Sequence, residues 1–281
     1  MAALALFQPD ARSRARLSDA LREYHELTFC QSWTDLWDTM VDGRLDGCIV
    51  DPHNSFDPVS LPEILHFRRR FPSTALIVSG EFTGRELDLY YLGRMGVDGV
   101  ILAGADHDHR QLRGRVEMAL SSWLAKRVAD ALEGILPPLG IRCVRWAIAH
   151  AEECPQVPDL VRAMRLSPRA LSRELRSRGL PSPRHLLLWG RLFQAARMLE
   201  GSDVTVEEVA FRLGYATAAS LGRAFRDRLD LSPSDLRHDQ RSLRRVMDAF
   251  VHSLEEREDL SRRWSSPDTR QAVMESFALR R

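Results

Sequence analysis

The sequence lacks the features by which several common classes of protein are recognised. No apolar run approaches the ~20 residues that a membrane-spanning helix requires. Residues 1–7 are apolar, but they lack a basic n-region and soon reach Pro9 and Asp10, so they predict a first strand and not a signal peptide. The four cysteines are far apart and lack metal-ligand spacing, which predicts reduced, mostly buried thiols in a cytoplasmic protein.

Catalytic and metal-binding patterns are also missing. The chain has no Ser-His-Asp or Cys-His arrangement, no Gly-rich phosphate loop and no zinc-type spacing, so we expect neither an enzyme nor a bound cofactor. The run Asp106-His107-Asp108-His109 has the residue types of a metal site. Such a run is also typical of a helix N-terminus, where acids complement the helix dipole and polar side chains cap the helix. We interpret it as a cap.

The charge is unevenly distributed along the 281 residues. Residues 1–130 hold 15 Lys and Arg against 19 Asp and Glu (net −4), and residues 131–281 hold 25 against 20 (net +5). Every basic residue except Lys126 is arginine. A basic half suits phosphate contact, although this excess is too small to indicate DNA binding by itself. A hydrophobic content of 44% with 28% charged residues is typical of a globular protein, and the length allows two domains.

The first half of the chain alternates short apolar runs with amphipathic segments. The apolar runs predict strands at Leu4–Phe7, Leu27–Cys30, Gly47–Val50, Ala75–Ser79 and Gly99–Leu102. The segments between them predict helices at about 11–24, 33–42, 60–70, 84–95 and 108–126. Ser60–Glu63 and Thr83–Glu86 have the spacing of capping boxes. Five strands that alternate with five helices predict an α/β domain with a parallel sheet covered on both faces.

A long helix leads out of this half. Residues 111–134 place six apolar side chains on one stripe, namely Val116, Leu120, Trp123, Leu124, Val128 and Leu132. Gly134 and Pro137-Pro138 break the helix, so we place a domain boundary there, with residues 135–140 as a linker. The helix is longer than the α/β domain needs, which leaves two interpretations open: an interdomain or dimerisation element, or a rigid linker.

The second half is predicted to be all helical and contains a repeat. The segment Leu171-Ser172-Arg173-Glu174-Leu175-Arg176 returns fifty positions later as Leu221-Gly222-Arg223-Ala224-Phe225-Arg226. Each copy follows a short apolar-periodic segment and a tight break, at Ser167-Pro168 and at Gly214. A short helix, a turn and a second helix with outward arginines form a helix-turn-helix, and two of them in tandem indicate DNA binding.

Start and stop signals outline the helices around the repeat. Ser167-Pro168 is an N-cap with proline at the first helical position, Thr205–Glu208 has capping-box spacing, and Gly214 supplies a left-handed turn. Helices are predicted at about 141–153, 168–178, 183–200, 206–213 and 216–228, with a short final helix from 231. Residues 241–263 predict one more helix with an apolar face, which either packs on a domain or dimerises.

These motifs resemble the DNA-binding domain of the AraC/XylS family of bacterial transcription regulators, over residues 141–237. The matching stretches are Leu166–Arg173, Arg191 with Ala195–Leu199, Val206–Tyr215, Leu221–Arg226 and Leu231–Ser234. The resemblance implies two helix-turn-helix units joined by a central helix. It implies that the first recognition helix presents Arg169, Ser172, Arg173 and Arg176 to DNA. The second is implied to present Thr217, Ala218, Ala219, Ser220, Gly222 and Arg223.

The second recognition helix departs from the family pattern. Ala218, Ala219 and Gly222 stand where the family often has larger polar residues, and they can touch a thymine methyl but cannot hydrogen-bond to base edges. We therefore expect the first unit to carry most direct readout, and the second to bind mainly phosphate and DNA shape. Asp230 replaces the family's usual glycine and Leu229 an aromatic residue, so the end of this helix is expected to differ.

The first half resembles a CheY-like receiver domain of the flavodoxin-like fold, over about residues 3–126. Asp51 stands where a receiver keeps its phospho-accepting aspartate, and Ser79 matches the hydroxyl residue that contacts the phosphoryl group. Gln8-Pro9 replace the family's acidic pair for Mg²⁺, with Asp10 one place late, and Ala103-Gly104 replace its lysine. Two alternatives remain: a pseudo-receiver for dimerisation or partner binding, or a response regulator switched by phosphate on Asp51. We favour the pseudo-receiver, because little would neutralise a phosphoryl group there.

Together these patterns predict a cytoplasmic bacterial transcription regulator that binds double-stranded DNA and does not associate with membranes. The predicted domains are 1–134 (receiver-like), 135–140 (linker), 141–238 (AraC-type DNA-binding domain) and 239–281 (helical extension). We expect a homodimer through the first domain or through the helix at 111–134, with a further protein partner as a possibility. The alternative is a protein-interaction regulator with weakened DNA binding, which the alanine-rich second recognition helix would permit.

Overall fold

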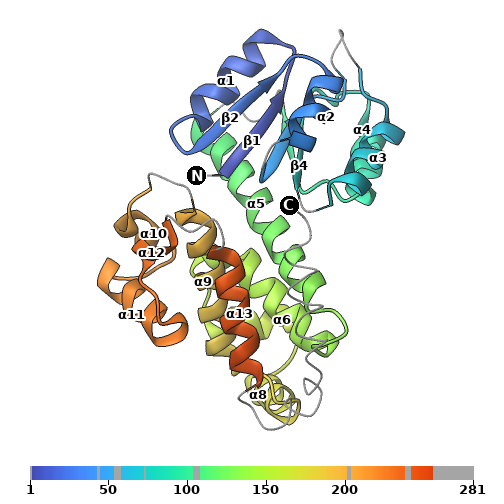
Figure 1. Cartoon of the computed structure of the whole chain (residues 1–281). Coiled ribbons are helices and arrows are strands. Elements are labelled where there is room, and N and C mark those ends of the chain that lie inside the picture. The colour runs from blue at the N-terminus through green and yellow to red at the C-terminus, as the bar shows by residue number, and fades with distance from the viewer. Residues whose placement is uncertain are drawn as a thin grey trace. The chain divides into compact units, whose positions relative to one another are not determined.

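The chain forms two compact units (Figure 1). The computed structural model describes residues 2–42, 45–53, 58–72, 74–103, 108–200, 204–237 and 242–255. The first unit comprises Ala2–Trp123, and the second begins at Leu124. This division falls inside one long helix, α5 (His109–Ala131), whereas the predicted first domain, residues 1–134, includes all of it.

The first unit is built on a five-stranded parallel sheet with the order β2-β1-β3-β4-β5, which is that of the flavodoxin-like fold. The strands are β1 (Ala2–Phe7), β2 (His25–Cys30), β3 (Gly47–Val50), β4 (Ala75–Gly80) and β5 (Gly99–Leu102). They alternate with α1 (Ala11–Leu21), α2 (Trp33–Asp42), α3 (Leu61–Arg70) and α4 (Glu86–Arg94), and α5 follows β5. The predicted α/β fold is confirmed, and each strand is found within two residues of its predicted bounds.

The central strands are continuously hydrophobic because both faces of the sheet are buried. Every residue of β3 and β4 is buried, and in β1 only Ala3 is partly exposed. The sheet is therefore covered on both faces, as predicted. Between α2 and α3 the core is aromatic, since the ring centroids of Trp33 and Trp37 lie 5.2 and 5.4 Å from that of Phe67. The carboxyl ends of the parallel strands meet at one edge, which places Asp51 directly after β3.

The two predicted capping boxes of this unit have different outcomes. At α3 the Ser60 hydroxyl accepts the Glu63 N–H at 3.3 Å, and the Glu63 carboxylate accepts the Ser60 N–H at 2.7 Å, which confirms the box. At α4 the predicted Thr83 box is wrong. Residues 82–85 form a turn that is closed by a backbone hydrogen bond of 2.9 Å from the N–H of Arg85. Helix α4 starts after Arg85, so Thr83 lies in the turn and not at the N-cap.

The acidic run before α5 fits a cap. The Asp108 carboxylate accepts the N–H of Arg110 at 3.3 Å, and the helix begins at His109. Asp106 and His107 lie outside the described residues. Within the described part of the chain, no group of three or more His, Cys, Asp or Glu side chains could hold a metal ion. The helices described here include none that is both long and apolar enough to cross a membrane.

Helix α5 is nearly as long as predicted. It ends at Ala131, and Gly134 then takes the left-handed conformation with a φ of +82°. The predicted apolar stripe is buried within the chain at all six positions: Val116, Leu120, Trp123, Leu124, Val128 and Leu132. A dimer through this helix would therefore need a different face from the one that the sequence suggests. The next helix begins at Pro138, so residues 138–140 of the predicted linker are helical.

The second unit is all helical, as predicted. Its helices are α6 (Pro138–Ala149), the 3-10 turn η1 (Ala151–Glu153), α7 (Val157–Met164), α8 (Pro168–Ser177), α9 (Pro183–Leu199), α10 (Val206–Arg212), α11 (Ala218–Leu229), α12 (Pro233–Arg237) and α13 (Ser242–Glu255). Helix α9 is central and contacts α6, α7, α8, α10, α12 and α13. At Gly190 an added Cβ would overlap the backbone carbonyl of Ala147 in α6, so glycine permits this close approach of α6 and α9.

Helix α13 covers one side of α9. The ring centroid of Phe250 lies 5.3 Å from that of Trp189 and 6.0 Å from that of Phe193, both on α9. The predicted apolar face consists of Leu243, Val246, Met247, Phe250 and Leu254; the last four are fully buried, and Leu243 is partly exposed. Of the two alternatives for residues 241–263, packing on a domain is therefore the correct one for residues 242–255, and the remainder lies outside the described residues.

Candidate nucleic-acid interface

Helix α7, a tight turn and α8 form the first helix-turn-helix. Arg165 follows α7 in the left-handed conformation, with a φ of +55°, and so reverses the chain before Ser167. The Ser167 hydroxyl accepts a backbone N–H of α8 at 3.1 Å, and Pro168 is the first helical residue, which confirms the predicted cap. Leu171 and Leu175 are fully buried, and their burial fixes which face of α8 points outward.

The outward face of α8 carries the residues that the family resemblance implies. Arg169, Ser172, Arg173 and Arg176 are all exposed. The three arginines are four and three residues apart, so they follow one side of the helix. No hydrogen bond or ion pair within the described residues engages any of their guanidinium groups. Arg178, by contrast, lies 3.6 Å from Glu174, which favours an intrahelical pair for that residue.

Helix α10, a turn and α11 form the second helix-turn-helix. The Thr217 hydroxyl caps α11 by accepting the Ser220 N–H at 3.1 Å, and the two hydroxyls are 3.0 Å apart. The Arg223 guanidinium donates to the Ser220 hydroxyl at 3.3 Å. Ala219 is exposed, and Ala218 and Gly222 are partly exposed. Much of the hydrogen-bonding capacity at the start of α11 is therefore used within the helix, unlike that of α8.

The repeat in the sequence has a direct structural counterpart. The apolar positions are fully buried in both copies: Leu171 and Leu175 in α8, and Leu221 and Phe225 in α11. The polar positions are exposed in both copies: Arg173 and Arg176 in α8, and Arg223 and Arg226 in α11. Both recognition helices thus bury and expose equivalent faces.

Left-handed residues shape the second unit. Gly214 has a φ of +72°, as its turn requires. Asp230, which replaces the family's usual glycine, is the C-cap of α11 and has a φ of +53°. The end of α11 therefore keeps a left-handed residue although the sequence departs from glycine. Aspartate is one of the few residues other than glycine that adopt this conformation, because its short polar side chain can hydrogen-bond locally.

Asp51 and Ser79 lie at the ends of neighbouring strands in the first unit. Asp51 follows β3, and Ser79 is the penultimate residue of β4. The Asp51 carboxylate accepts the N–H of His53 at 3.0 Å. Burial raises the pKa of the Asp51 carboxyl, and hydrogen bonds from the His53 backbone and the Gln8 side chain oppose that rise. The carboxylate is thus already engaged by neighbouring groups.

The residues around Asp51 do not fit the Mg²⁺ site of a receiver. Gln8 places a neutral amide where the family has an acid, and this buried amide donates to a carbonyl of β4 at 3.4 Å. The Asp10 carboxylate caps α1 by accepting a backbone N–H at 2.7 Å. Among the residues described directly after β1, the acidic pair with which a receiver binds Mg²⁺ is thus reduced to the single carboxylate of Asp10, whose charge also raises the pKa of the Asp51 carboxyl. Ala103 brings no charge to the position of the family's lysine, and Gly104 lies outside the described residues.

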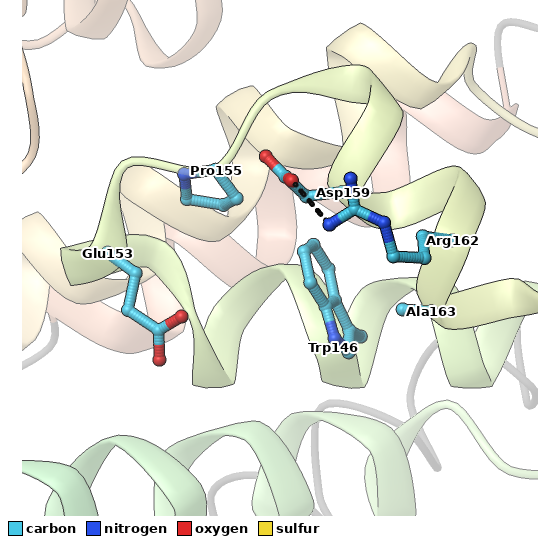
Figure 2. A pocket seen from close by; sticks show the side chains of 6 residues that line it. All are labelled: Trp146, Glu153, Pro155, Asp159, Arg162 and Ala163. Carbon is cyan, nitrogen blue, oxygen red and sulfur yellow. Dashed lines mark hydrogen bonds and ion pairs between the residues drawn. The ribbon is translucent and has the colours of Figure 1, made fainter.

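A cavity of about 460 Å³ opens beside α6 and α7 (Figure 2). It is lined by Trp146, Glu153, Pro155, Asp159, Arg162 and Ala163. Arg162 and Asp159 are paired at 3.4 Å, and the Trp146 ring stacks on His150 with a centroid distance of 4.5 Å. Three of the lining residues lie on α7, and neither recognition helix contributes one.

Two features of the helical unit are not predicted from the sequence. One is the close approach of α6 and α9 at Gly190. The other is the carboxylate of Glu152, which binds arginines of α9 and α10. Glu152 and its partner Arg212 are 60 residues apart, so no local spacing could signal their contact.

Comparison with known proteins agrees with a helix-turn-helix assignment. Residues 160–239 match the family model of a helix-turn-helix domain. The chain is 27% identical over 213 residues to the HTH-type transcriptional activator RhaS of Yersinia pestis bv. Antiqua (strain Angola), which covers 68% of this chain and 76% of that protein. It is 31% identical over 84 residues to the transcriptional activator RhrA of Rhizobium meliloti (strain 1021), which covers 29% of this chain and 26% of that protein.

Similarity to solved structures is looser. NtrX from Brucella abortus, in complex with ADP, superposes with a TM-score of 0.42 and 16% sequence identity, covering 60% of this chain and 41% of that chain. This chain therefore spans about two fifths of the length of NtrX. The flavodoxin-like assignment of the first unit rests on its own strand order.

Proposed function

We propose that this chain, whose residues 160–239 form a helix-turn-helix domain of the AraC type, regulates transcription by binding double-stranded DNA. The observation that supports this most is the outward face of α8, where Arg169, Arg173 and Arg176 are exposed and have no partner within the described residues. A recognition helix enters the major groove, where arginine binds guanine O6 and N7 in a bidentate manner. The relatives RhaS and RhrA are named as transcriptional activators.

The two recognition helices are proposed to enter successive major grooves on one face of DNA. The 17 residues of α9 span roughly 25 Å, and major grooves on one face recur every ~34 Å. For direct readout we propose the residues of α8: Arg169, Ser172, Arg173 and Arg176. For contacts with phosphate, thymine methyls and DNA shape we propose residues of the second helix-turn-helix: Thr217, Ala218, Ala219, Ser220, Gly222 and Arg223. The proposed DNA-binding domain is 141–238, with 239–281 as its extension.

Salt dependence of DNA binding tests this function. In fluorescence anisotropy on promoter-bearing duplex, we expect sequence-specific binding whose log affinity falls against log salt by about 0.9 for each phosphate neutralised. A scrambled duplex of equal length is the control and should bind more weakly at every salt concentration. Weak binding that ignores sequence would reject the proposal and favour the protein-interaction regulator.

We infer that the first unit is a pseudo-receiver that serves dimerisation or partner binding. Support comes from Gln8 and Asp10, since one is an amide and the other caps α1. A phosphoryl group on Asp51 would add up to about two negative charges to a partly buried site that lacks the acidic pair for Mg²⁺. It would be poorly stabilised there.

Beryllofluoride with Mg²⁺ is therefore expected to change neither the molecular mass in solution nor the affinity for DNA. Light scattering and anisotropy would measure the two quantities in the same buffer. The matched control is Asp51→Asn, which removes the acceptor carboxylate. A Mg²⁺-dependent change in the wild type that is absent from Asp51→Asn would establish the alternative, a response regulator switched by phosphorylation.

A further inference from the structure

We propose that a cluster centred on Glu152 positions the two recognition helices relative to each other, and so sets which spacing of DNA contacts the protein accepts. The Glu152 cluster consists of Glu152, Gln194, Arg197 and Arg212. None of these residues lies on α8 or α11. The inference rests on the proposed function, because it requires both helix-turn-helix units to bind the same DNA molecule.

Glu152 joins three elements through one carboxylate. It lies in η1, just before α7 of the first helix-turn-helix. Its Oε1 is 3.3 Å from Nη2 of Arg197 on α9, and its Oε2 is 2.7 Å from Nη2 of Arg212, the last residue of α10. The three side chains are 25%, 7% and 22% exposed, so solvent screens these ion pairs much less than surface pairs. One carboxylate thus holds the segment that leads into the first helix-turn-helix against both α9 and α10 of the second helix-turn-helix.

The network continues into α6. Arg197 Nε donates to the side-chain oxygen of Gln194 at 2.8 Å, and the Gln194 amide donates to the carbonyl of Ile148 at 3.0 Å. Gln194 is fully buried. Arg197 is therefore oriented by a partner that α6 holds in place, and Glu152 binds to a fixed guanidinium.

The turn of the second helix-turn-helix also packs against the segment before α7. An added Cβ at Gly214 would lie 2.6 Å from the Cys154 sulfur, and that thiol donates to the Arg212 carbonyl at 3.7 Å. Next to this contact, Arg191 of α9 donates to the Pro155 carbonyl at 3.3 Å. The segment that leads into α7 therefore contacts the second helix-turn-helix directly, so α9 is not the only connection between this segment and the second helix-turn-helix.

The contact between the segment before α7 and the second helix-turn-helix has a consequence for specificity. Two recognition helices in successive grooves must match the ~34 Å repeat of DNA. An interface that holds the two recognition helices in one orientation disfavours DNA sites with another spacing. A loosened interface lets the recognition helices adjust to either spacing. Glu152 is therefore a positioning residue, and its loss should reduce discrimination between spacings.

The test uses Arg212→Met in the full chain, which removes one charge, retains much of the apolar stem and leaves Glu152 paired with Arg197. The probes are the duplex that wild-type protein selects from a random-sequence pool, and two derivatives with one or two base pairs inserted between the contacted grooves. In Arg212→Met the affinity ratio of selected to inserted duplex is expected to fall by about 3- to 10-fold. Arg212→Lys keeps the charge and should recover part of the ratio.

The matched control is Arg162→Met, which removes the arginine of an exposed ion pair in the same unit and should leave the ratio unchanged. Lost stability lowers binding equally for every duplex and therefore does not change the affinity ratio. Urea midpoints, measured in parallel, show whether each variant is folded. If Arg212→Met does not fold, Glu152→Asp takes its place, since it keeps a charge beside Arg197. An unchanged ratio in a folded variant overturns this proposal alone. If wild-type protein selects no duplex, the proposed function fails as well.

Discussion

Replacing Gly190 by alanine is expected to destabilise the helical unit by about 3 kcal/mol, the upper part of the range for overpacking a core. The added Cβ would lie 2.6 Å from the carbonyl carbon of Ala147 and 3.1 Å from its Cβ. The first of these is a backbone atom, so relief requires α6 and α9 to separate. At a helical position without such a neighbour, the same change would instead stabilise the helix by up to ~1 kcal/mol. The sign of the effect is therefore diagnostic.

Gly114→Ala is the control for this prediction. Gly114 lies within α5, and no atom comes within 4 Å of an added Cβ there, so the midpoint of urea unfolding should rise or stay constant. Unfolding followed by circular dichroism would compare the two variants. Because the glycines lie in different units, each unit's transition must be assigned separately. If Gly190→Ala unfolded at the same urea concentration as wild type, that result would contradict the close contact between α6 and α9 at Gly190.

Among variants that change function, Arg173→Ala is expected to have the largest effect. Loss of one bidentate base contact costs about 1–3 kcal/mol, so affinity for the specific duplex should fall by about 5- to 150-fold. Its guanidinium has no partner in the described part of the chain, so the substitution removes no internal contact there. Preference for the specific over the scrambled duplex should fall with it. Fluorescence anisotropy at one fixed salt concentration measures both quantities.

Two further variants separate readout from general charge. Arg223→Ala should mainly make the salt dependence shallower, by about one unit of slope, because we assign Arg223 to phosphate. Arg178→Ala, at the C-cap of α8, is the matched control, since that arginine is already paired with Glu174. If Arg178→Ala weakened binding as much as Arg173→Ala, the face of α8 would act as undifferentiated positive charge. Base readout by Arg173 would then be rejected.

Local elements of this chain were predictable because their signals are local. The strands β1, β3 and β4 are predictable from the sequence because both of their faces are buried, which makes their sequences continuously apolar. Ser60 is predicted as a cap from the spacing of its capping box and Ser167 from the proline that follows it, and both hydroxyls make the expected hydrogen bond. Thr83 shares that spacing, but Gly84 with a φ of +74° closes a turn there and displaces the start of α4.

The candidate DNA-contacting surface was predictable for a different reason. The repeat aligns Leu171 with Leu221, and burial of these residues determines which arginines point outward. The roles of those arginines came from family resemblance and remain proposals. Contacts between distant segments could not be predicted, because residues 60 positions apart, such as Glu152 and Arg212, meet only after the helices have packed. The apolar pattern of residues 241–263 likewise predicted a helix but not the surface that it covers.

Helix α13 also affects the order in which the protein can fold as it is made. The ribosome synthesises α9 well before residues 242–255, so the rings of Trp189 and Phe193 emerge without the Phe250 ring that later packs on them. Incomplete domains with exposed apolar surface are prone to aggregation and are bound by chaperones. A segment with no proposed role in DNA contact therefore completes the DNA-binding unit, and the growing chain stays vulnerable until that segment has been translated.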